Sequence, residues 1–94
     1  MYLHLGQNVV VPEADVIGIF DLDNATGSHI TRKFLSDAEK AGKVTSVSDE
    51  LPKSFILCSS IDAKRPGAAH DGFAVYLSQL SSQTLLKRSE TFWF

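Results

Sequence analysis

The sequence predicts a small α+β domain with a mostly antiparallel sheet, one long helix and a short C-terminal helix. Several short runs of branched and aromatic residues alternate with turn residues, which is typical of strands. Only one stretch, residues 28–41, combines helical spacing of apolar residues with a cap and a glycine stop. The length of 94 residues, at 44% hydrophobic content, indicates a single domain (1–94) with a thin core, which oligomerisation commonly supplements.

The first strands are predicted to form a hairpin. The runs YLHL (2–5) and NVVV (8–11) are joined by Gly6-Gln7, a connection of hairpin length. The next run, DVIGIFDL (15–22), is too short for a helix and rich in branched residues, so we expect a buried strand. Gly18 has no side chain to pack, which predicts a bulge or the close approach of another backbone.

The long helix is predicted to begin after Ser28, a suitable N-cap, and to end before Gly42. Its buried face is indicated by apolar residues at spacings of four, four and three: Ile30, Phe34, Ala38 and Ala41. Three later runs of strand-forming residues follow at 44–47, 55–60 and 73–78. The last segment, 81–90, is predicted to form a short capped helix.

Composition excludes several classes of protein. The formal net charge of −2 and the pI of about 5.8 argue against a protein that is basic all over and coats nucleic acid, although a local basic patch stays open. Cys58 is the only cysteine, which excludes an internal disulfide and fits a reducing cytoplasm. No signal peptide and no apolar run approaching the ~20 residues of a membrane span are found. We therefore expect a cytoplasmic protein outside the membrane.

No motif predicts catalysis, a cofactor or a metal site. Residues 21–27 begin like a calcium loop, but Arg32 stands where a bidentate glutamate belongs, so we interpret them as a turn before the helix. The histidines His4, His29 and His70 lack ligand spacing. Phosphate-binding glycine loops and nucleophile elbows are also missing from the sequence. We expect a protein that is not an enzyme.

Five strings in order carry a resemblance to a known family: MYLHLG, DVIGIFDL, AEKAGKV, DELPKSF and VYLSQLSSQTLLKR. Together they resemble the RemB branch of the extracellular-matrix regulators, relatives of the biofilm regulator RemA. The resemblance spans nearly the whole chain, apart from the loop 60–72 and the aromatic end. It implies a bacterial cytoplasmic protein, a ring-forming α+β domain, and a transcriptional role in matrix-gene expression through DNA binding.

The chain departs from the RemA branch at positions that matter for DNA. In that branch an arginine precedes the first long apolar strand, and a pair of arginines occupies the turn before the next one. The matching positions here are Asp15 and Glu50-Leu51, which leaves Lys53 as the basic residue of that turn. Carboxylates repel phosphates, so these replacements weaken the expected attraction to DNA. Two functions therefore stay open. One is a ring-forming regulator that binds double-stranded DNA, and the other is a ring-forming interaction protein without DNA affinity of its own.

The candidate DNA contacts lie in the acidic turn, in an exposed loop and on the long helix. They are Lys53, Lys64, Arg65, Arg32 and Lys33. For the turn, the alternative is a structural corner, in which Pro52 fixes the backbone. For the helix pair, the alternative is a solvated face without a partner.

Two parts of the chain are candidates for contacts between subunits. In an oligomer, the backbone that approaches Gly18 could belong to a neighbour. The tail TFWF (91–94) contains two phenylalanines and the only tryptophan. Aromatic residues are enriched at interfaces, and an exposed cluster is an aggregation liability. We therefore expect a homo-oligomer with Gly18, Phe92, Trp93 and Phe94 at its contacts; the alternative is that the tail folds back on its own sheet.

Overall fold

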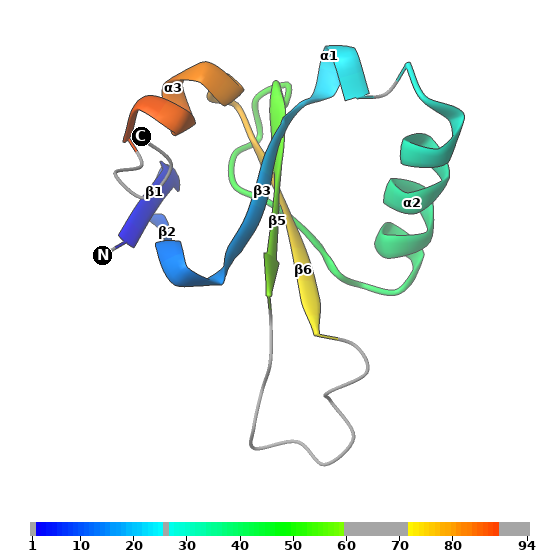
Figure 1. Ribbon diagram of the computed structural model, residues 1–94, viewed down its shortest axis with the longest axis horizontal. Helices are drawn as coiled ribbons and strands as arrows, with labels where there is room; N and C mark the ends of the chain where they lie inside the picture. Colours follow the sequence, from blue (N-terminus) through cyan, green and yellow to red (C-terminus); the bar gives the residue numbers. More distant parts are fainter. Residues whose placement is uncertain (1, 26, 60–71, 89–94) are drawn as a thin grey trace.

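A four-stranded sheet stands at the centre of the molecule, with a β-hairpin and a short helix on one face and the long helix on the other (Figure 1). The computed structural model describes residues 2–25, 27–59 and 72–88. The strands are β1 (Tyr2–Gly6), β2 (Val9–Pro12), β3 (Val16–Asp21), β4 (Val44–Ser46), β5 (Ser54–Ser59) and β6 (Phe73–Ser78). The helical elements are η1 (Glu13–Asp15), α1 (Leu22–Ala25), α2 (His29–Lys40) and α3 (Ser82–Arg88).

The sheet confirms the predicted fold class. Its strand order is β3-β5-β6-β4, in which β3 pairs antiparallel with β5 and β5 antiparallel with β6. Only β4 runs parallel to its neighbour β6. Helix α2 lies in the crossover from β3 to β4, which returns the chain in the direction of β3. Strand β6 also runs in that direction, since β3 and β6 are both antiparallel to β5, so β4 and β6 pair in parallel. The architecture is therefore α+β with a mostly antiparallel sheet.

The N-terminal hairpin is confirmed, but its turn lies one residue later than predicted. Gly6 still pairs with Val9, and the register shifts between His4 and Gly6. The turn consists of Gln7 and Asn8, and Gln7 takes a φ of 49°. Two-residue hairpins need a positive φ at the first turn position. The irregular register on β1 therefore moves the turn away from the glycine.

Helix α2 begins and ends as the sequence predicts. The Oγ of Ser28 accepts a hydrogen bond from the backbone N–H of Thr31, and Ala41 follows the last helical residue as C-cap. Gly42 has a φ of 75°, in the left-handed region that glycine adopts without steric cost. Its N–H bonds to the carbonyl of Glu39, and the next N–H, of Lys43, bonds to the carbonyl of Ala38. This pair of bonds is a Schellman stop.

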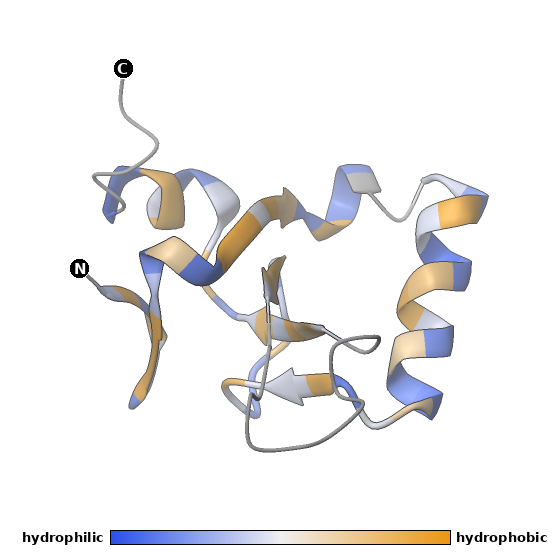
Figure 2. Cartoon of the chain, turned by 60° about the horizontal axis from the view of Figure 1, so that its bottom comes forward, coloured by the Kyte–Doolittle hydropathy of each residue, from blue (hydrophilic) through white to orange (hydrophobic). Residues whose placement is uncertain are grey.

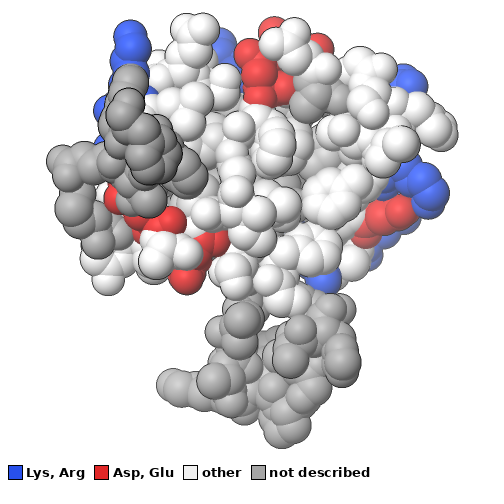
Figure 3. All heavy atoms as spheres, viewed as in Figure 1, with Lys and Arg blue, Asp and Glu red and all other residues white. Residues whose placement is uncertain are grey.

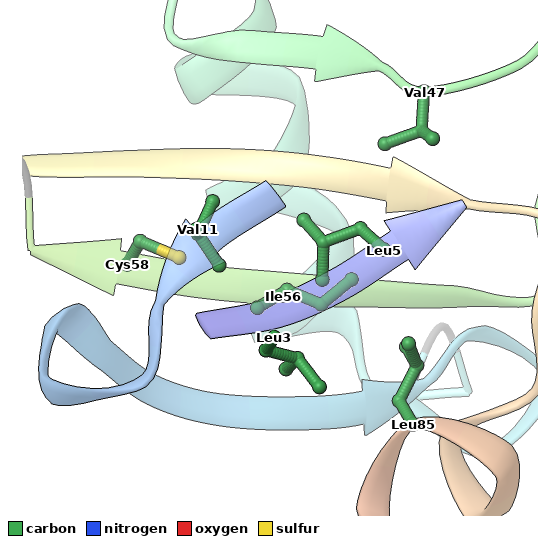
Figure 4. Close-up of a cluster of buried hydrophobic side chains, with 7 residues drawn as sticks. All are labelled: Leu3, Leu5, Val11, Val47, Ile56, Cys58 and Leu85. Atoms are coloured by element: carbon green, nitrogen blue, oxygen red, sulfur yellow. The ribbon is translucent and has the colours of Figure 1, made fainter. Parts of the chain in front are cut away.

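The core between the hairpin and the sheet is built from both ends of the chain. Leu3, Leu5 and Val11 come from the hairpin, while Ile56 and Cys58 come from β5 (Figure 4). Leu85 of α3 and Val47, which follows β4, close the same cluster. Leu3, Leu5, Ile56 and Leu85 have no exposed surface. Burial of apolar side chains from distant segments is what holds the hairpin to the sheet.

Two buried serines reinforce this junction. Ser54 and Ser78 lie opposite each other on β5 and β6, and both are completely buried. The Oγ of Ser78 donates to the carbonyl of Leu5 at 2.6 Å, which ties β6 to the hairpin. The Oγ of Ser54 donates to the carbonyl of Leu80 at 2.7 Å. Both hydroxyls thus donate to carbonyls that lie outside the four-stranded sheet.

The expectation that residues 15–22 form a buried strand is wrong. Strand β3 is the edge of the sheet, and none of its residues is fully buried. Ile17 is 58% exposed because it is the extra residue of a bulge between Val16 and Gly18, which confirms the irregularity predicted at this glycine. An edge strand has a partner on one side only, so a continuous apolar run does not by itself ensure burial.

The predicted buried face of the helix is only partly correct. Ala38 is buried and Phe34 is half-buried, but Ile30 is 80% exposed and Ala41 is also exposed. The cluster on this side of the sheet centres on Ala38, Phe55 and Val75. Helical spacing gives the direction of a side chain, whereas its burial depends on whether another element lies opposite.

Candidate functional site

The acidic turn before β5 is a corner held by the backbone at both ends. The N–H of Val47 bonds to the carbonyl of Leu77, and the N–H of Lys53 bonds to the carbonyl of Ser78 at 2.8 Å. The carbonyl of Lys53 accepts from the N–H of Leu22. Within the corner, the N–H of Glu50 bonds to the Oγ of Ser48. The backbone of Lys53 is thus hydrogen-bonded on both sides just before β5 begins, while its side chain is exposed to solvent.

The side chains of this corner alternate between charge and apolar surface. Asp49, Glu50 and Lys53 are exposed, and Leu51, at 86%, is the most exposed of the large apolar residues that the structure describes. Asp49 and Glu50 also line a polar groove of about 450 Å³, together with Gln7, Ser46, Val47 and Ser48. Asp49 and Glu50 precede Lys53 by only four and three residues, so a phosphate that approaches this corner also meets carboxylates, which weaken the attraction.

The helix pair Arg32 and Lys33 lies on the solvent side of α2. Lys33 Nζ forms an ion pair with Asp37 Oδ2 at 3.0 Å, one turn further along the helix. Both side chains are largely exposed, so the pair contributes little to stability. It does, however, reduce the positive charge that the helix presents.

The described basic candidates are not brought together. Lys53 lies in the corner before β5, whereas Arg32 and Lys33 lie on α2. Lysine and arginine side chains appear at separate places around the rim of the view in Figure 3. Lys64 and Arg65 of the loop, and Phe92, Trp93 and Phe94 of the tail, lie outside the described residues.

Asp15, at the position where the RemA branch has an arginine, acts on a buried thiol. It is exposed at the end of η1. Burial, and secondly the negative charge of Asp15, raise the pKa of Cys58 from 9.0 to about 11. The thiol is therefore protonated and unreactive at neutral pH. This cysteine is part of the core, not a nucleophile.

An apolar groove between α2 and the edge of the sheet is the feature that sequence reasoning missed. It has a volume of about 320 Å³ and is lined by Phe20, Ile30, Thr31, Phe34, Phe55 and Leu57. The rings of Phe20 and Phe55 stack, with their centroids 4.8 Å apart and their planes inclined by 19°. Figure 2 shows β3 as hydrophobic along much of its length, with hydrophobic parts of α2 across from it. The surface between these elements carries no charged side chains in Figure 3.

The groove exists because α2 covers only part of its face of the sheet. Ala38 and Leu35 of α2 belong to the cluster that includes Val44 of β4 and Val75 of β6. At the other end of the helix, Ile30 stands over the groove with most of its surface in solvent. The apolar spacing of the helix and the apolar run of β3 were both visible in the sequence. That they face each other across an open space was not.

Gly18 lies against Phe20, one of the residues that line this groove. A Cβ atom at this position would stand 2.7 Å from two carbons of the Phe20 ring. The atoms nearest to that Cβ position are thus carbons of a phenyl ring on the same strand. A contact between Gly18 and a neighbouring subunit stays a prediction.

Two further findings concern the described part of the chain. No group of three or more histidine, cysteine, aspartate or glutamate residues is placed there to hold a metal ion. None of the helices in these ranges has the length and apolar character needed to cross a membrane.

Comparison with known proteins gives one clear similarity. No protein-family model matches the sequence. Extracellular matrix regulatory protein B of Bacillus subtilis (strain 168) is 34% identical over 90 residues. The aligned residues cover 96% of this chain and 91% of the Bacillus protein. The similarity therefore extends along nearly the whole length of both chains and does not depend on one short motif.

Proposed function

Since the chain belongs to the family of extracellular matrix regulatory protein B, we propose that it is a cytoplasmic regulator of extracellular-matrix gene expression. It acts as a ring-like homo-oligomer that binds DNA. The observation that carries the regulatory role is the similarity over nearly the whole of both chains. Ring assembly and DNA binding rest on what the family resemblance implies. They also rest on the exposed apolar residues at the edge of the sheet and on the exposed basic residues.

The apolar surface around the edge of the sheet supports an oligomer. Phe20 is 41% exposed and Ile30 is 80% exposed beside the groove, and Ile17 protrudes from the same strand as Phe20. Apolar clusters of this kind on a small domain mark protein interfaces or become aggregation sites. A contact between subunits removes this surface from water.

Repetition in an oligomer supports DNA binding by a chain of net negative charge. Among the described candidate contacts of each copy, Lys53 and Arg32 are exposed and form no ion pair with an acidic residue of the described chain. In a ring the same residues recur at fixed spacing, so that individually weak phosphate contacts act together. Affinity is then modest for one copy and strongly dependent on salt for the assembly.

Three observations favour the alternative, an interaction module without DNA affinity of its own. The net charge is −2, the corner of Lys53 contains Asp49 and Glu50, and Lys33 is paired with Asp37. Under this alternative the ring presents its exposed apolar and acidic residues to another protein. The two functions therefore make opposite predictions for binding to promoter DNA.

Fluorescence anisotropy with a labelled matrix-gene promoter duplex separates the DNA-binding ring from the interaction module, when it is repeated at salt concentrations of about 50 to 200 mM. For a DNA-binding ring we expect affinity to fall steeply with salt, with a slope of about −0.9 for each phosphate neutralised. Light scattering on the same samples reports the oligomer. An intact oligomer that does not bind the duplex at the lowest salt contradicts DNA binding and supports the interaction module.

Charge substitutions identify the contact. We expect the double variant Lys64→Ala, Arg65→Ala to weaken binding at low salt and to make the salt slope less steep. Lys53→Ala and the double variant Arg32→Ala, Lys33→Ala test the other two candidate sites. Lys40→Ala, which removes an exposed charge from the last turn of α2, is the matched control. If the control lowers affinity as much as the candidates, binding depends on overall charge and not on these sites.

A further inference from the structure

The groove between α2 and β3 is shaped for aromatic side chains. Three phenyl rings line it, from Phe20, Phe34 and Phe55, and two of them are already stacked. Ile30 and Leu57 complete an almost wholly apolar lining. Aromatic rings pack favourably in offset-stacked or edge-to-face arrangements beyond the area that they bury. An aromatic segment is therefore the occupant that this lining fits best.

The chain itself contains such a segment. Residues 91–94, TFWF, follow α3 after only Ser89 and Glu90, and contain two phenylalanines and the only tryptophan. We propose that residues 91–94 of one copy fill the groove of the next copy. This inference rests on the proposed homo-oligomer and names the two surfaces that join its subunits.

The position of α3 favours a neighbour's groove over the chain's own. Leu85 packs α3 into the cluster between the hairpin and the sheet, on the face opposite α2. In Figures 1 and 2, α3 and α2 lie on opposite sides of β3, and α3 leads the chain away from α2. Residues 89–94 span at most ~20 Å when fully extended. To reach its own groove, the segment would have to reverse and pass around the edge of the sheet.

The resulting contact joins two different surfaces of the chain. The groove lies on the α2 side of the sheet, whereas the segment leaves from the α3 side. A contact between unlike surfaces is heterologous, and repeated copies of it close into a ring or continue as a filament. The inferred contact is therefore compatible with the ring proposed above.

The tryptophan provides a direct measurement. Trp93 is the only tryptophan, so tryptophan fluorescence, excited selectively over the two tyrosines, reports the environment of this segment alone. We expect its emission to shift to the blue as the protein concentration rises, in parallel with the mass from light scattering. Ile30→Glu should abolish both changes, since it places a charge in the groove at a position exposed enough not to disturb the fold. Leu51→Glu is the matched control, an equally exposed apolar residue that is not part of the groove lining.

A mixing experiment tests the direction of the contact. A chain that lacks residues 91–94 retains the groove, and the Ile30→Glu chain retains the segment. Each variant alone should be monomeric, and the mixture should form a one-to-one complex that does not grow further. Trp93 emission should shift to the blue only in the mixture.

The outcomes separate this inference from the proposed oligomer. If the intact protein is an oligomer whose mass and Trp93 emission are unchanged by Ile30→Glu, the tail does not occupy the groove, and the oligomer stands. If the chain is monomeric throughout and its Trp93 emission is blue-shifted at every concentration, the tail packs on its own domain, and both proposals fail.

Discussion

The ring of Phe20 lies over Gly18, at a position where a Cβ atom on residue 18 would stand 2.7 Å from two of its carbons. The same ring stacks on Phe55 of the neighbouring strand. The missing side chain at Gly18 thus gives the ring room to lie along the sheet and form one wall of the groove. Glycine in a strand commonly marks such a close approach.

Gly18→Ala should therefore displace the Phe20 ring and lose its stacking on Phe55. We expect a fall of about 1 kcal/mol in the free energy of unfolding, close to the value of one aromatic pair. Urea denaturation of the single variants and of the double variant Gly18→Ala, Phe20→Ala forms a double-mutant cycle. Once the ring is gone, alanine at position 18 should cost little. An equal cost in both backgrounds contradicts this explanation.

Ser78→Ala removes the hydrogen bond that joins β6 to the hairpin. The hydroxyl donates to the carbonyl of Leu5 at 2.6 Å and accepts from the N–H of Leu80 at 3.1 Å. Because the carbonyl of Leu5 and the N–H of Leu80 lose this partner, the free energy of unfolding should fall by about 1–3 kcal/mol. Ser46→Ala, at an exposed position of β4, is the matched control and should change it by less than about 0.5 kcal/mol.

The neighbouring residues Leu85 and Leu86 test the packing of α3. Leu85 is completely buried in the core, whereas Leu86 is 37% exposed. Leu85→Ala should lower the free energy of unfolding by about 2–5 kcal/mol, through lost apolar burial and the cavity that remains. Leu86→Ala should cost much less in the same thermal or urea melt. Similar costs for the two variants would show that α3 does not pack as described.

The buried thiol predicts a loss of stability at alkaline pH. The pKa of Cys58 is about 11 in the folded chain against an ordinary value of 9.0. Between these values the unfolded chain loses the thiol proton and the folded chain keeps it. The free energy of unfolding should therefore fall as pH rises through this window, by at most about 2–3 kcal/mol. Well below pH 9 the thiol is protonated in both the folded and the unfolded chain, so its titration does not change the free energy of unfolding there.

Comparison with Cys58→Ala isolates the contribution of the thiol from every other effect of alkaline pH. The variant should be less stable at neutral pH but should lose less further stability between pH 9 and 11. A parallel measurement with a thiol reagent at neutral pH should show slow labelling of the native protein and fast labelling in urea. Rapid labelling without urea would contradict burial of the thiol.

The sequence by itself determined the elements whose limits depend on local chemistry. Ser28 and Gly42 bound α2 because a hydroxyl cap and a left-handed glycine act within one turn of the helix. The hairpin and β6 were likewise predicted from runs of strand-forming residues between turns. These features require no knowledge of the remaining chain. Even so, the hairpin turn moved by one residue, because the irregular pairing at His4 and Gly6 is a property of two strands together.

Only the tertiary structure decided which of these apolar residues are buried. Ile30 has the spacing of a core residue and Phe20 belongs to an apolar run, yet both are exposed beside the groove. Their exposure follows from the placement of β3 at the edge of the sheet and from the packing of Ala38 at the far end of the helix. Burial depends on contacts between segments distant in the sequence, which periodicity within one segment does not encode. The groove is therefore lined in part by residues, such as Ile30 and Phe20, whose sequence pattern predicts burial but which no further segment of the described chain covers.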